Sequence, residues 1–243
     1  MFNEPNTSTL PAYHIIRRRR KSIAIKVIAG TVEVHAPLRV SEREIRQLVQ
    51  LRQAWIAGHL RRQQAFYADL PLRRWQHGEH VYWLGERLHL SVRSGKASRV
   101  VREQQDLCVT LGRRVSQPAQ KVQQLVRQWY QQQAEQWLQD WLVSAPWQPQ
   151  SARVAHFKAK WGACSRAGEL SFTWKLWQAP AWVVSYVAQH ELCHLRHFNH
   201  SADFWRLVAQ LNPDYQNAER WLKQFGAALL NDDYLTVPDR ASL

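Results

Sequence analysis

The 243-residue sequence has few cysteines, no long apolar run and few acidic residues. Its three cysteines, Cys108, Cys164 and Cys193, are odd in number and far apart, which excludes a disulfide framework and favours reduced thiols in the cytoplasm. No uninterrupted apolar stretch approaches the roughly 20 residues of a membrane-spanning helix. The first residues have neither a basic start nor an apolar core, so we expect no signal peptide. These absences predict a cytoplasmic protein without a membrane partner.

The positive charge is unevenly distributed. Lys and Arg number 33 against 19 Asp and Glu, a formal net charge of +14. Residues 1–120 contain 21 basic and 9 acidic residues, whereas residues 121–243 contain 12 and 10. Such an excess favours polyanions, through phosphate contacts and the release of counterions, and it equally suits a solubilising surface. Nucleic acid bound by the basic N-terminal half is therefore one candidate partner.

The composition is that of a folded protein with both helices and strands. Hydrophobic residues make up 45% of the chain and include 13 Trp. We expect an α+β fold whose parts are a loose leader over residues 1–12, a basic β-rich and helical region over 13–145, a C-terminal helical region over 150–230 and a tail over 231–243. Pro146 and Pro149 mark the clearest boundary in the chain, between these two regions, but not a linker between independent domains.

An antiparallel sheet is predicted in the N-terminal half. Alternating and β-branched residues predict a strand over residues 22–28 with its hairpin partner over 31–37, and further strands over residues 81–84, 87–92, 100–101 and 107–111. Gly85-Glu86 fits a two-residue hairpin turn. The basic run Arg17–Arg20 suits either a patch for nucleic acid or nucleotide, or a charged edge that prevents aggregation between strands.

Two long helices are predicted within residues 13–145. Ser41 and Glu44 form a capping-box pattern at the start of a helix that continues to Phe66, with a break expected near Gly58. Pro118 begins a second helix with an apolar stripe that runs to about residue 142.

The segment from His190 to His194 reads HExxH and lies in a helix predicted to begin at Pro180. Residues four apart share one helix face, so the two imidazoles can bind one Zn²⁺ ion. Glu191 lies at the edge of that face, where a general base reaches metal-activated water. We expect the helix to stop at Asn199 and the chain to turn there, bringing His200 to the metal as third ligand.

His197 is the alternative third ligand, since a longer helix would present it to the metal. Three protein ligands leave one position open, as in catalytic zinc sites. The spacing through His200 equals that of metzincins (HExxHxxGxxH), but His197 replaces their glycine and the only methionine, Met1, supplies no Met-turn. A structural metal site would need a fourth ligand, for which His197 and Cys164 are the candidates.

These motifs resemble the YgjP-like zinc metallopeptidases, which are similar to SprT-like and gluzincin-type enzymes. The resemblance rests on KWGACS at 160–165, ELSF at 169–172, the HExxH helix and NHSADFW at 199–205, and it is strongest over residues 153–225. It implies a zincin-like fold, one zinc or other divalent ion on His190, His194 and His200, and Glu191 as the catalytic base. The family's central serine in its WGSCS-type motif is Ala163 here.

Two strands are predicted over residues 154–162 and 169–174, directly before the HExxH helix. In zincin-like folds an edge strand beside this helix holds an extended peptide by backbone pairing, and Gly162 would let a substrate backbone approach closely. A plain core hairpin is the alternative. We therefore expect a zinc-dependent metallopeptidase with a polypeptide substrate.

Other interpretations stay open. The same site suits a nucleoside triphosphate pyrophosphatase acting on a nucleotide, and the basic half suits a nucleic-acid-associated protease of SprT-like type. Asp203 either orients His200 or is an ordinary first-turn acid of a helix capped by Ser201. Tyr215 either donates to a developing oxyanion or packs as an aromatic residue.

Overall fold

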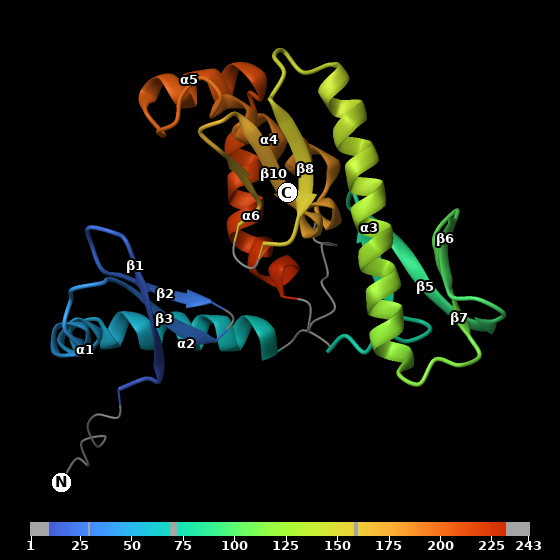
Figure 1. Cartoon of the computed structure of the whole chain (residues 1–243), viewed down its shortest axis with the longest axis horizontal. Coiled ribbons are helices and arrows are strands. Elements are labelled where there is room, and N and C mark those ends of the chain that lie inside the picture. Colours follow the sequence, from blue (N-terminus) through green and yellow to red (C-terminus); the bar gives the residue numbers. More distant parts are fainter. Residues whose placement is uncertain (1–9, 29, 69–71, 158–159, 232–243) are drawn as a thin grey trace, which may run out of the picture. The chain divides into compact units, whose positions relative to one another are not determined.

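The computed structural model describes residues 10–28, 30–68, 72–157 and 160–231 (Figure 1). The chain forms two compact units, residues 1–70 and residues 71–243. Most of the leader expected over residues 1–12, and of the tail expected over 231–243, lies outside the described residues.

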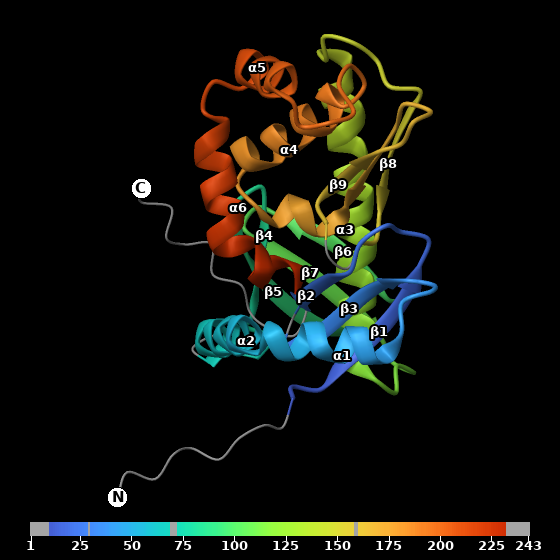
Figure 2. The same cartoon turned by 90° about the vertical axis from the view of Figure 1, so that its left-hand side faces the viewer.

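The first unit is a three-stranded sheet covered by two helices. Its elements are β1 (Tyr13–Arg18), β2 (Ala24–Ile28), β3 (Thr31–Pro37), α1 (Glu42–Leu51) and α2 (Gln53–Ala68). The strand order is β1-β3-β2, and the central strand β3 buries Val32, Val34 and Ala36. These side chains alternate along the strand, so they share one face and pack there against Ile45 and Val49 of α1 (Figure 2).

The predicted hairpin of the first unit is confirmed, but its third strand was not predicted. β2 pairs antiparallel with β3, whereas β1 pairs parallel with it, so the expectation of a purely antiparallel sheet is wrong. β1 lies at the edge of the sheet, and the side chains of Arg17 and Arg18 on it are exposed. This is the position expected of a charged edge.

Ser41 caps α1 as predicted. The Ser41 N–H donates to Glu44 Oε2 (2.9 Å) and the Glu44 N–H donates to Ser41 Oγ (3.2 Å). The break between the helices lies at Arg52 and not near Gly58, because the Arg52 N–H donates to the carbonyls of both Leu48 and Val49 and so tightens the last turn. Gly58 lies inside α2, since a single glycine costs a helix only about 1 kcal/mol.

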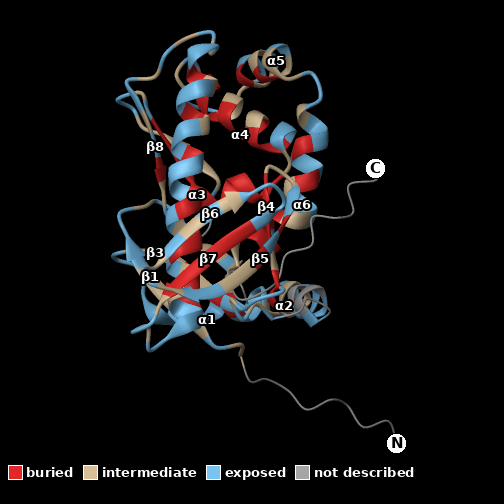
Figure 3. Cartoon of the chain, turned by 90° about the vertical axis from the view of Figure 1, so that its right-hand side faces the viewer, coloured by how far each residue is buried: buried red, intermediate tan, exposed pale blue. Residues whose placement is uncertain are grey.

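The larger sheet of the second unit has the order β4-β5-β7-β6. Its strands are β4 (His80–Trp83), β5 (Glu86–Gly95), β6 (Arg99–Glu103) and β7 (Asp106–Gly112). β7 is buried from Leu107 to Leu111 and lies in the interior, whereas the charged strand β6 alternates between exposed and half-buried and lies at the edge (Figure 3). β7 therefore inserts next to β5 and pairs with it in parallel, which corrects the antiparallel prediction.

The β4–β5 hairpin is confirmed with its turn shifted by one residue. Trp83 pairs with Glu86, so Leu84 and Gly85 form the turn, with φ of 52° and 84°. Positive φ at both positions is the geometry of a type I′ hairpin turn. Leu84 is held there because its N–H donates to the carbonyl of Trp177 (2.7 Å), a contact invisible to local sequence patterns.

The long helix α3 (Pro118–Val143) begins at Pro118 as predicted. It packs against β7 and also against β8 (Ser151–Ala155) and the 3₁₀ helix η1 (Trp174–Gln178). Residues 146–149, where we expected the boundary between regions, lie inside the second unit. One apolar core contains residues from before, within and after α3, so this boundary does not separate independent domains.

The strand predicted over residues 154–162 is two strands in the structure. β8 and β9 (Gly162–Cys164) flank β10 (Glu169–Thr173), in the order β8-β10-β9. β8 pairs parallel and β9 antiparallel with β10. β10 lies in the centre because residues 170–173 are all buried, and this leaves β9 at an edge.

Three helices complete the second unit: α4 (Ala181–Cys193), α5 (Ala202–Leu211) and α6 (Tyr215–Leu230). Ser201 caps α5 as expected, accepting from the Phe204 N–H (3.4 Å). α4 ends at Cys193 and not at Asn199, because residues 194–196 form successive tight turns with hydrogen bonds three residues back. None of the described helices is both long and apolar enough to cross a lipid bilayer.

Candidate metal centre

Three histidines from the C-terminal end of α4 and the segment just before α5 come together. Their ligand nitrogens all lie within 4.8 Å of one another, and Nε2 of His190 is 3.1 Å from Nε2 of His200. Nitrogen ligands about 2.0–2.1 Å from a tetrahedral zinc ion lie roughly 3.3 Å apart. The donor set of His190, His194 and His200 therefore fits a divalent metal such as zinc.

The early end of α4 decides which histidine completes the cluster. The turns at residues 194–196 reverse the chain, so the side chain of His200 joins His190 and His194. His197 contributes its backbone instead: its carbonyl oxygen lies 3.0 Å from Nδ1 of His194. If Nδ1–H donates this bond, Nε2 of His194 is left free to bind a metal.

Two aromatic side chains of α5 support the histidines. The buried Phe204 ring lies 4.9, 4.6 and 4.7 Å from the rings of His190, His194 and His200, centre to centre. Trp205 stacks on His200 at 5.6 Å. The sequence did not predict this contact, because it depends on where α5 packs.

Two histidines of the cluster, His190 and His194, are held in the neutral form that binds metal. Burial, followed by the proximity of His194 and His200, lowers the pKa of His190 to about 4. Burial also lowers the pKa of His194. At pH 7 each of these two imidazoles therefore offers one nitrogen lone pair to a metal without first losing a proton.

Glu191 lies beside the cluster, packed against strand β9. Its side chain is 9% exposed, and burial raises its pKa to about 7, although Lys160 and the backbone N–H of Cys164 lower it. A Cβ added to Gly162 would lie 2.5 Å from Cγ of Glu191. We expected Gly162 to make room for a substrate backbone, but the space above it is occupied by the Glu191 side chain.

A tyrosine extends the site toward α6. The Tyr186 hydroxyl lies 3.4 Å from Nδ1 of His190 and is also hydrogen-bonded to Glu219. Burial is the main reason that the pKa of Tyr186 is raised. This hydroxyl approaches the imidazole nitrogen of His190 that faces away from His200.

The other residues considered as metal ligands or catalytic groups lie outside the histidine cluster. Asp203 binds Arg206 (2.8 Å), which agrees with an ordinary first-turn acid and not with a partner for His200. Tyr215 stacks on Trp205 at 5.5 Å, as a packed aromatic residue does. The thiol of Cys164 donates to the carbonyl of Ser165 (3.4 Å), and among the described residues no fourth ligand joins the three histidines.

Comparison with known proteins agrees with this geometry. Residues 21–225 match the family model described as YgjP-like, metallopeptidase domain. Neither a curated protein nor a solved structure matches the chain. The match begins before β2 and ends within α6, so parts of both compact units are included. The chain therefore belongs to the YgjP-like metallopeptidase domain family, which indicates a metal-dependent hydrolase that acts on peptides.

Proposed function

We propose that this protein is a zinc-dependent metallopeptidase of the zincin-like type, with His190, His194 and His200 as metal ligands and Glu191 as general base. One observation supports this assignment above the others. Glu191, a buried carboxylate with a pKa of about 7, directly follows His190, one of three histidines whose nitrogens are spaced for one metal ion. A general base works best when its pKa lies near the operating pH.

A zinc ion held by these residues supplies Lewis-acid chemistry, acidifying water and polarising a carbonyl group. Glu191 removes a proton from the attacking water through its carboxylate oxygen and returns it to the departing amine. The Cys164 N–H, which donates to this carboxylate, holds it at the edge of the cluster. Burial beneath β9 limits competing water and keeps the charged form of Glu191 weakly solvated.

Strand β9 offers a site for the substrate backbone. Hydrogen bonds from Thr173 to Trp161 (2.9 Å) and from Ser165 to Glu169 (2.9 Å) show that odd-numbered residues of this segment face β10. Backbone groups alternate along a strand, so those of Gly162 and Cys164 face the free edge. Glu191 takes the Cys164 N–H, and the other outward groups are available to an extended peptide.

The test compares metal-loaded wild type with Glu191→Gln on an unstructured polypeptide substrate. The variant should keep its bound metal, because the three histidines are unchanged, and lose activity by roughly 10²–10⁴-fold. His59→Ala, a change in the first unit, is the matched control and should cleave normally.

A panel of nucleoside triphosphates is assayed in parallel. Release of phosphate or pyrophosphate that depends on Glu191, without peptide cleavage, would replace the peptidase assignment by a nucleotide hydrolase. Equal peptide cleavage by wild type and Glu191→Gln would remove Glu191 as the base.

A further inference from the structure

Five basic side chains line a hollow in the second unit that shares no residue with the histidine cluster. A cavity of about 640 Å³ lies between the β5–β6 turn and the segment joining β7 to α3, and a smaller one of about 390 Å³ adjoins it. Their cationic lining is Arg93, Lys96, Arg99, Arg113 and Arg114, here named the basic notch. No residue of the histidine cluster lines it.

The notch is built by pairing between strands. Arg93 of β5 and Arg99 of β6 both lie opposite Thr110 of β7, so the two arginines project from the same face of the sheet. The Gly112 N–H donates to Ser98 Oγ (3.0 Å), which ties the β7–α3 segment to the β5–β6 turn. The cations therefore converge from segments that are held together.

The charge of the notch is largely uncompensated. Asp and Glu are absent from the described residues that line it. Arg93 makes a long ion pair with Glu103 (3.6 Å), and both side chains are half exposed. In the described part of the chain, no ion pair involves the other four cations, so the notch concentrates positive potential.

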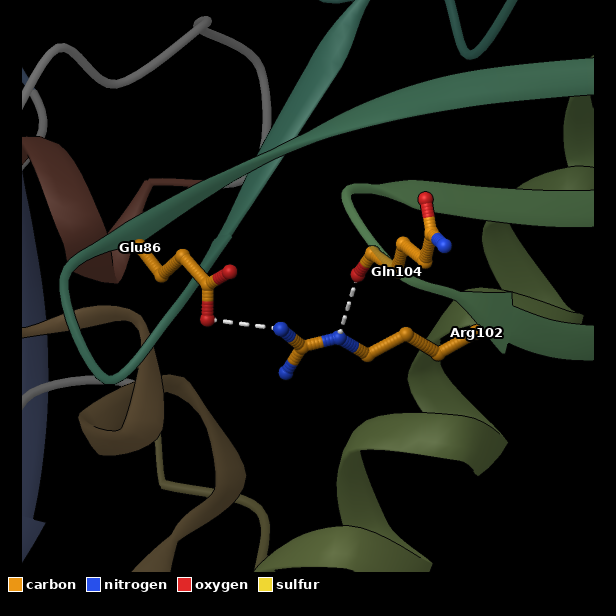
Figure 4. A network of polar contacts seen from close by, with 3 residues as sticks. All are labelled: Glu86, Arg102 and Gln104. Atoms are coloured by element: carbon orange, nitrogen blue, oxygen red, sulfur yellow. Dashed lines mark hydrogen bonds and ion pairs between the residues drawn. The ribbon is translucent and has the colours of Figure 1, made fainter.

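Arg102 lies on the same strand as Arg99, but its charge is compensated by an acidic partner. Its guanidinium donates to Glu86 (2.6 Å) and to the carbonyl of Gln104 (3.0 Å), as Figure 4 shows. Arg102 lies three residues from Arg99 and so projects from the opposite face. Protection of an edge strand would explain cations on β6. It does not explain Lys96, Arg113 and Arg114, which lie in turns.

We propose that the basic notch binds the phosphodiester backbone of a nucleic acid without reading its sequence. Guanidinium groups suit phosphate because they donate two parallel hydrogen bonds. Aromatic side chains are absent from the described lining, so bases cannot stack there, and contact is limited to phosphate and sugar. This site is independent of the histidine cluster and of the reaction proposed for it.

Fluorescence anisotropy with a labelled DNA duplex and an RNA strand of equal length tests the proposal. The full chain is compared with Arg113→Gln/Arg114→Gln and with Lys96→Gln/Arg99→Gln. The matched control is Arg18→Gln/Arg19→Gln, which removes the same charge from exposed positions of the first unit. Thermal unfolding and peptide cleavage of all variants check that the fold is intact.

We expect each notch variant to bind at least roughly tenfold more weakly at low salt, with the slope of log K against log salt reduced by about 2. The control should bind like wild type, and a preference between the DNA and RNA probes would identify the natural nucleic acid. The proposal is overturned if wild type does not bind, if control and notch variants weaken equally, or if a polyglutamate peptide competes as well at equal charge.

Discussion

The chemistry of the candidate site depends on single buried groups. Glu191 is a carboxylate whose burial favours the protonated form, whereas burial of His190 favours its neutral form. Burial of Glu191 therefore makes the protein less stable as the pH rises, whereas burial of His190 makes it less stable as the pH falls. Lowering the pH through 6.5 toward 4 destabilises the protein through His190, because the unfolded state then binds the extra proton.

Glu191→Gln should stabilise the metal-free protein at alkaline pH. The folded-state pKa of Glu191 is raised from 4.5 to about 7, so the wild type loses stability as the pH rises through this interval. The variant has no carboxyl group to ionise and does not lose this stability. Its free energy of unfolding should exceed that of the wild type by roughly 3 kcal/mol at pH 8 and by less than about 1 kcal/mol at pH 5. Urea unfolding with a chelator present measures both values, and an advantage independent of pH would contradict the raised pKa.

Tyr186→Phe should weaken zinc binding by roughly tenfold or more, because the Tyr186 hydroxyl contacts Nδ1 of His190. Competition against a coloured chelator measures this affinity. Tyr215→Phe is the control, since Tyr215 packs on Trp205 without contacting a ligand through its hydroxyl. Equal affinities of the Tyr186 variant and wild type would show that Tyr186 only fills space.

At the scale of elements, strand β9 and helix α4 pack against each other. Their close approach is possible because Gly162 has no side chain where Glu191 lies. The tight turns after Cys193 are equally important, since they end α4 early and return the chain to the cluster at His200.

Gly162→Ala should displace Glu191 or β9, because the new Cβ would lie 2.5 Å from Cγ of Glu191. We expect a loss of stability of about 1–3 kcal/mol and at least a tenfold loss of peptide cleavage, with metal binding retained. Ala163→Ser on the same strand is the matched control and should be tolerated. Cleavage rates, bound metal and urea unfolding together separate this result from general misfolding, in which metal binding would also be lost.

At the scale of the molecule, metal binding should stabilise the second unit specifically. Twelve of the 13 Trp lie in residues 71–243, so tryptophan fluorescence mainly reports that unit. Zinc at about 100 times its dissociation constant should add roughly 2.7 kcal/mol to the unfolding free energy. His200→Ala should remove this gain and His59→Ala should keep it, whereas a gain retained in His200→Ala would exclude His200 as a ligand.

The sequence alone determined the features that depend on neighbouring residues. The HExxH spacing places His190 and His194 on one helix face, and Ser41 and Pro118 mark helix starts, because helix geometry and capping are local. Tertiary structure decided the rest. Only packing and tight turns select the side chain of His200 over that of His197, place Glu191 above Gly162, and insert β7 beside β5 in parallel. These outcomes depend on contacts between segments far apart in the sequence, and local sequence patterns do not reveal how strongly such contacts stabilise the fold.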